Sequence, residues 1–152
     1  MNLMMKYALT YHLLGYFILP LAARSKQPHK KLATRGLYSA TNDWSVIENW
    51  FVKDPDINLG IACQMSGLVV CDVDFRNGGK VDDLPETRTV QTGNGFHYYY
   101  TADESRTFKG KHAQGIDIKW KGYVVAAPSI HPSGALYKAN GGSLVAAGEW
   151  LQ

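Results

Sequence analysis

The hydrophobic pattern of the chain changes its period at Ile57, and this change constrains the fold more than any other feature. From that point on, short runs rich in β-branched and aromatic residues are separated by glycine, proline and asparagine, which is typical of strands joined by turns. The runs read INLGIAC, GLVVCDVDF, RTVQT, FHYYYT, GIDIKW and YVVAAPS. We therefore expect most of the sheet to lie in the second half of the chain.

The first half indicates a helix, a short strand and a second helix. Apolar residues recur at helical spacing at Met4, Tyr7, Ala8, Tyr11 and Leu14. Gly15 falls where a helix commonly ends, and the segment YFILPL then reads as a buried strand. A second helix begins in SATNDWSVIENWF, with N-cap candidates Thr41, Asn42 and Asp43. We predict a single α+β domain over residues 1–152, with a mixed or antiparallel sheet and an N-terminal helix-strand module packed on it.

Composition indicates a globular protein and leaves the choice of partner open. The formal charge of +3 is too small to prove a nucleic-acid partner, although the run RSKQPHKKLATR carries five basic residues and no acid. A signal peptide is the alternative for the first 24 residues, but His12 and three tyrosines interrupt its apolar segment. No run approaches the ~20 apolar residues of a membrane-spanning helix. Cys63 and Cys71 lie in strand-like segments, so we expect reduced thiols, a cytoplasmic location and no membrane partner.

Two aspartates end the run VVCDVDFRNGG. Because residues two apart in a strand point the same way, Asp72 and Asp74 are predicted to share one face with Val70. One interpretation is that these aspartates simply begin a turn, since DFRNGG is good turn material. The other is that they form half of a metal site. At this point the two interpretations are equally supported.

Two later strands repeat the pattern of one apolar and one polar face. His97 stands opposite the apolar face of FHYYY, and Asp117 and Lys119 stand opposite the apolar face of GIDIKW. If the three strands are neighbours, Asp72, Asp74 and Asp117 gather near His97, and such carboxylates repel one another unless a cation neutralises them. Aspartate oxygens match Mg²⁺ or Mn²⁺, and two such ions are the usual arrangement for in-line phosphoryl transfer. The pattern therefore indicates nucleotidyl transfer.

These motifs, in this order, resemble the bifunctional DNA primase/polymerase (prim-pol) domain of the archaeo-eukaryotic primase superfamily, found at the N-terminus of many plasmid and phage replication proteins. The resemblance covers nearly the whole chain, from GYFILPL through SGLVVCDVDFRNGG and LPETRTVQTGNGFHYYY to GIDIKWKGYVVAAPSIHPSGALY. It implies an RRM-like catalytic sheet. It also implies that Asp72, Asp74 and Asp117 bind the catalytic metals and that His97 contacts the triphosphate of the incoming nucleotide.

The resemblance extends to further positions in the same pocket. It implies nucleotide contacts by Arg76, Lys119, Ser129 and His131, each of which has an equally good interpretation as an ordinary turn or strand residue. The superfamily often has serine where this chain has Gly95, so only a backbone contact is expected there. Lys26 is a candidate for template or primer phosphate, and Tyr99 for stacking on a base.

We therefore expect a metal-dependent nucleotidyltransferase that extends a primer on a nucleic-acid template. Its expected partners are a DNA template and primer and nucleoside triphosphates, and a downstream helical or helicase domain of the same replication protein is a further candidate. Two alternatives remain at this point: a metal-dependent nuclease or template-independent transferase, and a non-catalytic nucleic-acid-binding module of a replication initiator.

Overall fold

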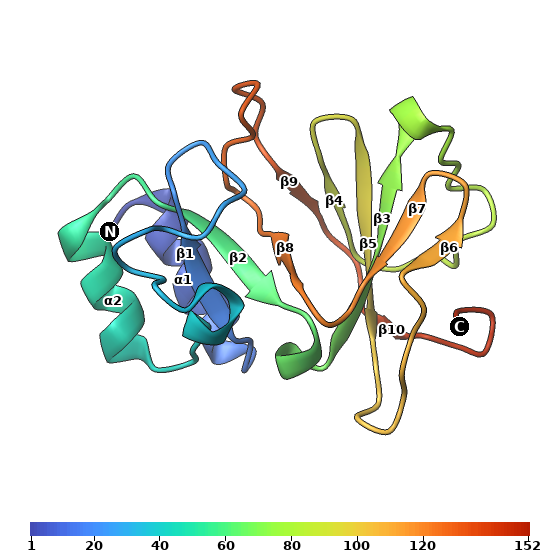
Figure 1. Cartoon of the computed structure of the whole chain (residues 1–152), viewed down its shortest axis with the longest axis horizontal. Helices are drawn as coiled ribbons and strands as arrows, with labels where there is room; N and C mark the ends of the chain where they lie inside the picture. Colours follow the sequence, from blue (N-terminus) through green and yellow to red (C-terminus); the bar gives the residue numbers. More distant parts are fainter.

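The computed structural model describes all residues from Met1 to Gln152 and has the α+β architecture that the sequence predicts. Figure 1 shows two lobes, one holding both helices and a small sheet, the other built on a larger sheet. The helices are α1 (Leu3–Leu13) and α2 (Trp44–Lys53), with 3₁₀ turns at Gly36–Ser39, Gln64–Ser66 and Phe75–Asn77. The strands are β1 (Ile18–Leu21), β2 (Asn58–Ala62), β3 (Leu68–Asp74), β4 (Thr89–Gln91), β5 (Gly95–Thr101), β6 (Lys111–Ala113), β7 (Ile116–Lys119), β8 (Tyr123–Val125), β9 (Lys138–Asn140) and β10 (Val145–Ala146).

Both helices have the end signals that the sequence indicates. The side chain of Asn2 accepts a hydrogen bond from the backbone N–H of Met5 and caps α1. Gly15, with φ +82°, ends that helix because its backbone conformation is left-handed, which favours glycine. Of the three N-cap candidates for α2, the cap is Asp43, which accepts from the N–H of Ser45. The helices thus begin and end on local chemistry.

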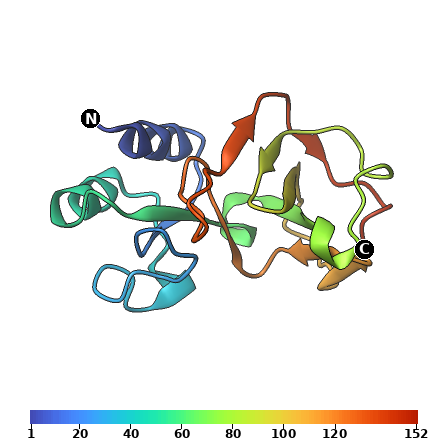
Figure 2. The same cartoon turned by 90° about the horizontal axis from the view of Figure 1, so that it is seen from above.

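The smaller sheet joins the two halves of the chain. Its order is β1-β2-β8, with both pairs antiparallel. Strand β8 comes from the second half of the sequence, so the N-terminal module is completed by a segment that lies 63 residues further on, as in the pairing of Ile61 with Val124. Figure 2 shows the chain crossing between the lobes to form this sheet. The expected N-terminal module is therefore present, but residues before Ile57 do not build it alone.

The larger sheet has the order β6-β7-β3-β5-β4-β9 and is antiparallel throughout this path. A short additional strand, β10, pairs with β5 in parallel. The sheet is therefore mixed only through β10. The finer expectation of an RRM-like core stays a prediction. The connection over GGKVDDLPETR is irregular and contains no helix, and the 3₁₀ turn at Phe75–Asn77 precedes it.

Each face of the larger sheet contributes to a separate core. Val69, Cys71 and Val73 point into a cluster of nine buried residues that the C-terminal segment covers with Leu151. On the opposite face, Val70 joins a cluster of 21 buried residues that includes both helices and the smaller sheet. This face is therefore buried at the start of β3, where the lobes meet, and only its later positions are free to carry polar groups.

Two aromatic residues depart from the expected positions. Tyr99 lies on the face of His97 as predicted, but it is only 4% exposed and packs in the larger core, so the prediction that it stacks on a base is wrong. Phe75 follows Val73 at a spacing of two, which would place it on the same apolar face of a strand, yet the strand has ended at Asp74 and the ring is 46% exposed. Strand alternation therefore gives the direction of Tyr99 but not its burial, and it no longer applies at Phe75, where the strand has ended.

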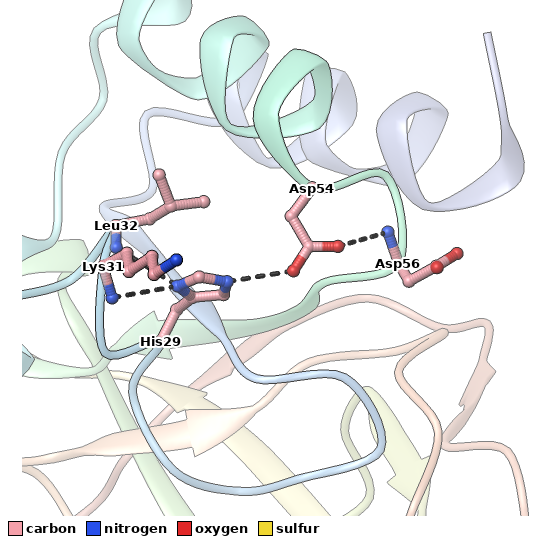
Figure 3. A network of polar contacts seen from close by, with 5 residues as sticks. All are labelled: His29, Lys31, Leu32, Asp54 and Asp56. Atoms are coloured by element: carbon pink, nitrogen blue, oxygen red, sulfur yellow. Dashed lines mark hydrogen bonds and ion pairs between the residues drawn. The ribbon is translucent and has the colours of Figure 1, made fainter.

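The basic loop after β1 is fastened to the end of α2. His29 Nδ1 accepts from the backbone N–H groups of Lys31 and Leu32, at 3.2 Å each, so its Nε2 carries the hydrogen that Asp54 accepts at 2.9 Å (Figure 3). Asp54 also accepts from the N–H of Asp56. The loop that carries Lys26 is therefore ordered by the hydrogen bonds of the His29 imidazole.

Asp54 makes part of the stability of this loop dependent on acid. The hydrogen bond from His29 and then that from the Asp56 backbone hold the pKa of Asp54 below its usual value of 3.8. A lowered carboxyl pKa contributes stability that is present above the unfolded pKa and is lost as pH falls through the folded one. We expect Asp54→Asn to be less stable than the wild type near neutral pH, with the difference shrinking as pH falls below 3.8 and through the lowered pKa of Asp54. Urea unfolding across this pH range measures it, with Asp56→Asn as the matched control. A difference that stays constant with pH would contradict the assignment.

No helix of the chain is long and apolar enough to cross a membrane. Cys63 and Cys71 are both free and buried, as the sequence predicts. Burial raises the pKa of each thiol to about 12, so neither is a nucleophile at neutral pH.

Candidate functional site

The centre of the site is a row of three residues on neighbouring strands of the larger sheet. Asp72 of β3 is paired on one side with His97 of β5 and on the other with Asp117 of β7. Directly opposite residues in antiparallel strands place their side chains on the same face. The structure thus brings together three residues that the alternation of apolar and polar positions had marked separately.

Asp72 and His97 form the closest contact in this row. The Nε2 atom of His97 lies 3.4 Å from Oδ1 of Asp72, and their side chains are 7% and 32% exposed. Burial raises the pKa of Asp72, but the contact with His97 and then the charges of Lys119 and Lys26 lower it by more. The net pKa is below the usual value, so Asp72 is a carboxylate at neutral pH. The other ring nitrogen of His97, Nδ1, is buried without a hydrogen-bond partner.

Asp74 is held by the turn that follows β3. Its Oδ1 accepts from the backbone N–H of Arg76 at 3.0 Å and from Nδ2 of Asn94 at 2.9 Å, and its Oδ2 accepts from Nδ2 of Asn77 at 2.7 Å. The turn interpretation of this motif is therefore correct for Asp74, and its carboxylate has a fixed position. A carboxylate that is already hydrogen-bonded can still bind a metal, since ligating carboxylates usually have such partners.

Three glycines allow the backbone segments beside Asp74 to come close together. A Cβ atom on Gly95 would lie 1.8 Å from the carbonyl oxygen of Val73, and one on Gly115 would lie 2.2 Å from the nitrogen of Gly79. None of these positions has room for a side chain. The ends of β3, β5 and β7 therefore meet more closely than ordinary residues would permit.

A cavity of about 600 Å³ opens beside the row. Three carboxylates line it, those of Asp72, Asp74 and Asp117, together with three cations, which are Lys26, Arg76 and Lys111. Only two of its 17 lining residues are hydrophobic, and its size is in the range of small-molecule sites. Balanced charges of both signs around a polar cavity suit a ligand that carries phosphate and arrives with cations.

The remaining predicted residues are divided between this cavity and other places. Arg76 and His131 line it, and Gly95 is opposite Asp74 at its edge. Lys119 does not line it and instead borders a neighbouring cavity of about 410 Å³. Ser129 is fully buried, and its hydroxyl group exchanges hydrogen bonds with the backbone of Leu59, so the structure does not bring it to either cavity.

The carboxylates of the cavity are the side chains that could hold a divalent metal. No three His, Cys, Asp or Glu side chains converge on one point as a preformed metal site. Asp72 and Asp117 nevertheless stand opposite one another on paired strands, and Asp117 is exposed with no hydrogen bond or ion pair to its side chain. Two such oxygen donors facing one cavity match the ligand preference of Mg²⁺ or Mn²⁺, and Asp74 lies at the same wall. The chemical type of these oxygen atoms therefore fits the predicted metal, although the three carboxylates do not converge on one point.

Several residues of the site were not found from the sequence. Asn77 and Asn94 lie in glycine-rich segments that give no sign of this role, but both donate to Asp74. Tyr137 lies between His97 and His131, with ring centres 6.2 Å and 5.9 Å from theirs, and lines the cavity. Burial and then the charge of Asp72 raise the pKa of Tyr137 to about 12, so it stays protonated. A tyrosine in an irregular segment carries no periodic signal that would have found it.

The fold and the cavity define an α+β domain whose central sheet carries carboxylates and cations on one open face. The family model described as bifunctional DNA primase/polymerase, N-terminal (Prim-Pol), matches residues 8–150. The chain therefore belongs to the Prim-Pol family, as its motifs indicated, and membership suggests a replication function of the primase/polymerase type. No curated protein matches the sequence significantly.

Proposed function

We propose that the 600 Å³ cavity is a nucleotidyl-transfer site that adds nucleotides to a primer on a nucleic-acid template, in the replication of a plasmid or phage. One observation carries this proposal: Asp72 stands between Asp117 and His97 in a single cross-strand row at the cavity wall. Membership of the Prim-Pol family supports the same reaction class.

The proposed reaction is an in-line displacement at phosphorus. The 3′-oxygen of the primer forms a bond to the α-phosphorus of a nucleoside triphosphate, and the bond from that phosphorus to the oxygen bridging to the β-phosphate breaks. Pyrophosphate leaves, and the proton of the 3′-hydroxyl group passes to water. Little covalent chemistry is asked of the protein, whose part is positioning and electrostatic stabilisation.

The residues of the cavity have distinct parts in this proposal. Lys26, Arg76 and Lys111 provide positive charge for the phosphates from three different segments of the chain. His97 contacts the triphosphate, and its ring is held by burial and by its contact with Asp72. Asn77 and Asn94 keep Asp74 in place. The site is thus prepared before the substrate arrives.

Asp72 and Asp117, with Asp74 beside them, would hold Mg²⁺ or Mn²⁺. The metal would supply Lewis-acid stabilisation of the charge that develops on the reacting oxygens. The three carboxylates support this role, because such a group repels a triphosphate unless cations neutralise it.

A primer-extension assay with Mg²⁺ or Mn²⁺ tests the proposal and separates it from its rivals. We expect the wild type to lengthen a labelled primer by the nucleotide complementary to each of the four template bases. A metal-dependent nuclease would shorten the primer instead. A template-independent transferase would add any nucleotide regardless of the template, and a binding module would shift the primer in a gel without changing its length. Each of these three results would exclude templated synthesis.

A further inference from the structure

The site consists of two cavities that meet at Asp72 and His97. The second cavity, of about 410 Å³, lies between the edge of β7 and strand β8, on the side of the smaller sheet. Both cavities are lined by Lys26, Asp72, His97 and Tyr137. Asp72 is the only carboxylate that borders both.

The two cavities differ in the chemistry of their walls. The first has Arg76 and Lys111 as its own cations and is almost wholly polar. The second has Lys119 as its own cation and an apolar wall formed by β8, in which Tyr123 is partly exposed and Val124 and Val125 are buried behind it. An aromatic and aliphatic wall facing an ammonium group suits a nucleoside that carries a phosphate, because the base can pack on the wall while the lysine binds the phosphate.

In-line transfer has two reactants, and the site offers one cavity for each of them. The attacking and leaving oxygens lie on opposite sides of the reacting phosphorus, so the two reactants approach from opposite sides. If the triphosphate occupies the polar cavity, the attacking strand must come from the other side of Asp72. We propose that the second cavity binds the 3′-terminal nucleotide of the primer, with its phosphate on Lys119 and its base and sugar against β8. This inference rests on the proposed function.

The placement of Lys26 agrees with this division. The hydroxyl group of Tyr123 donates a hydrogen bond to the backbone carbonyl of Lys26 at 2.7 Å, so the apolar wall and the basic loop hold each other. Lys26 reaches both cavities, whereas Lys119 borders only the second and Lys111 only the first. Lys119 and Lys111 thus form a matched pair of cations for an experiment.

The experiment compares Lys119→Gln with Lys111→Gln. The first probe is a fluorescent 5′-phosphorylated trinucleotide, whose binding is followed by anisotropy over a range of salt with no nucleoside triphosphate present. We expect Lys119→Gln to weaken trinucleotide binding roughly tenfold and to reduce the slope of log affinity against log salt concentration by about one. Lys119→Arg should restore most of the affinity. Lys111→Gln should change trinucleotide binding less than about twofold.

The second readout is single-nucleotide incorporation. Lys119→Gln should raise the KM for primer and leave the KM for nucleoside triphosphate unchanged, and Lys111→Gln should do the reverse. If Lys119→Gln instead raises only the KM for nucleoside triphosphate, or if it binds the trinucleotide like the wild type, the inference is overturned. A wild type that extends no primer, together with a Lys119→Gln variant that has lost trinucleotide binding, would remove the proposed reaction and keep the second cavity as an oligonucleotide site.

Discussion

Replacement of Asp72 by asparagine is expected to reduce single-turnover nucleotide incorporation on the order of 10³-fold or more, because the proposed function gives this carboxylate the part of a metal ligand at the reacting centre. Asp72 is the one carboxylate that faces both cavities and contacts His97, so no neighbouring acid occupies its place. A rapid-quench experiment at saturating primer and nucleotide measures the effect on the chemical step.

The same variant should remain folded. The asparagine oxygen can still accept from His97, and Asp72 is about one-third exposed, so we expect the free energy of unfolding to change by less than about 1 kcal/mol. Asp82→Asn is the matched control, since Asp82 is exposed and lines none of the described cavities. A folded Asp72→Asn variant with the incorporation rate of the wild type would exclude Asp72 from the site.

The second large effect is expected on stability, from Gly95→Ser. This change introduces the residue that the wider superfamily often has at this position. In this chain the new Cβ atom would lie 1.8 Å from the carbonyl oxygen of Val73 and 2.9 Å from its carbon, both of which are backbone atoms. The pairing of β3 with β5 must therefore shift, and we expect the variant to lose roughly 3 kcal/mol or more of unfolding free energy.

Chemical denaturation compares this variant with Gly110→Ser. A Cβ atom on Gly110 meets no atom within 4 Å, and Gly110 is exposed, so serine there should change the unfolding free energy by less than about 1 kcal/mol. Equal unfolding free energies for Gly95→Ser and Gly110→Ser would contradict this prediction. They would show that β3 and β5 can move apart at Gly95 without loss of stability.

The part of the site that follows from strand alternation could be predicted from the sequence. Asp72, His97 and Asp117 each stand opposite an apolar strand face, and a period of two leaves each of them only one face to occupy. Once β3 pairs with β5 and β7, these residues necessarily share a face. The helix ends were equally local, because a cap such as Asn2 or a left-handed Gly15 depends on neighbouring residues alone.

The rest depended on contacts between distant segments. The run that contains β8 reads as one more strand of the larger sheet, and only its pairing with Ile61 and its neighbours shows that it belongs to the smaller one. Because β8 belongs to the smaller sheet, its apolar residues lie beside Lys119 in the second cavity. Lys119 does not line the first cavity. The burial of Tyr99 and Ser129 has the same origin, because strand alternation gives the direction of a side chain but not what covers it.

The most direct test of the account is the binding of Mn²⁺, followed through the electron paramagnetic resonance signal of the free ion, to the wild type, Asp72→Asn, Asp117→Asn and the double variant. If the two carboxylates hold one metal from paired strands, each single variant should bind Mn²⁺ at least about tenfold more weakly. The double variant should lose little more affinity than either single variant, because the effects of substitutions at two residues that bind the same ion are not additive. Mn²⁺ affinities that remain those of the wild type in both single variants would contradict a metal site between β3 and β7.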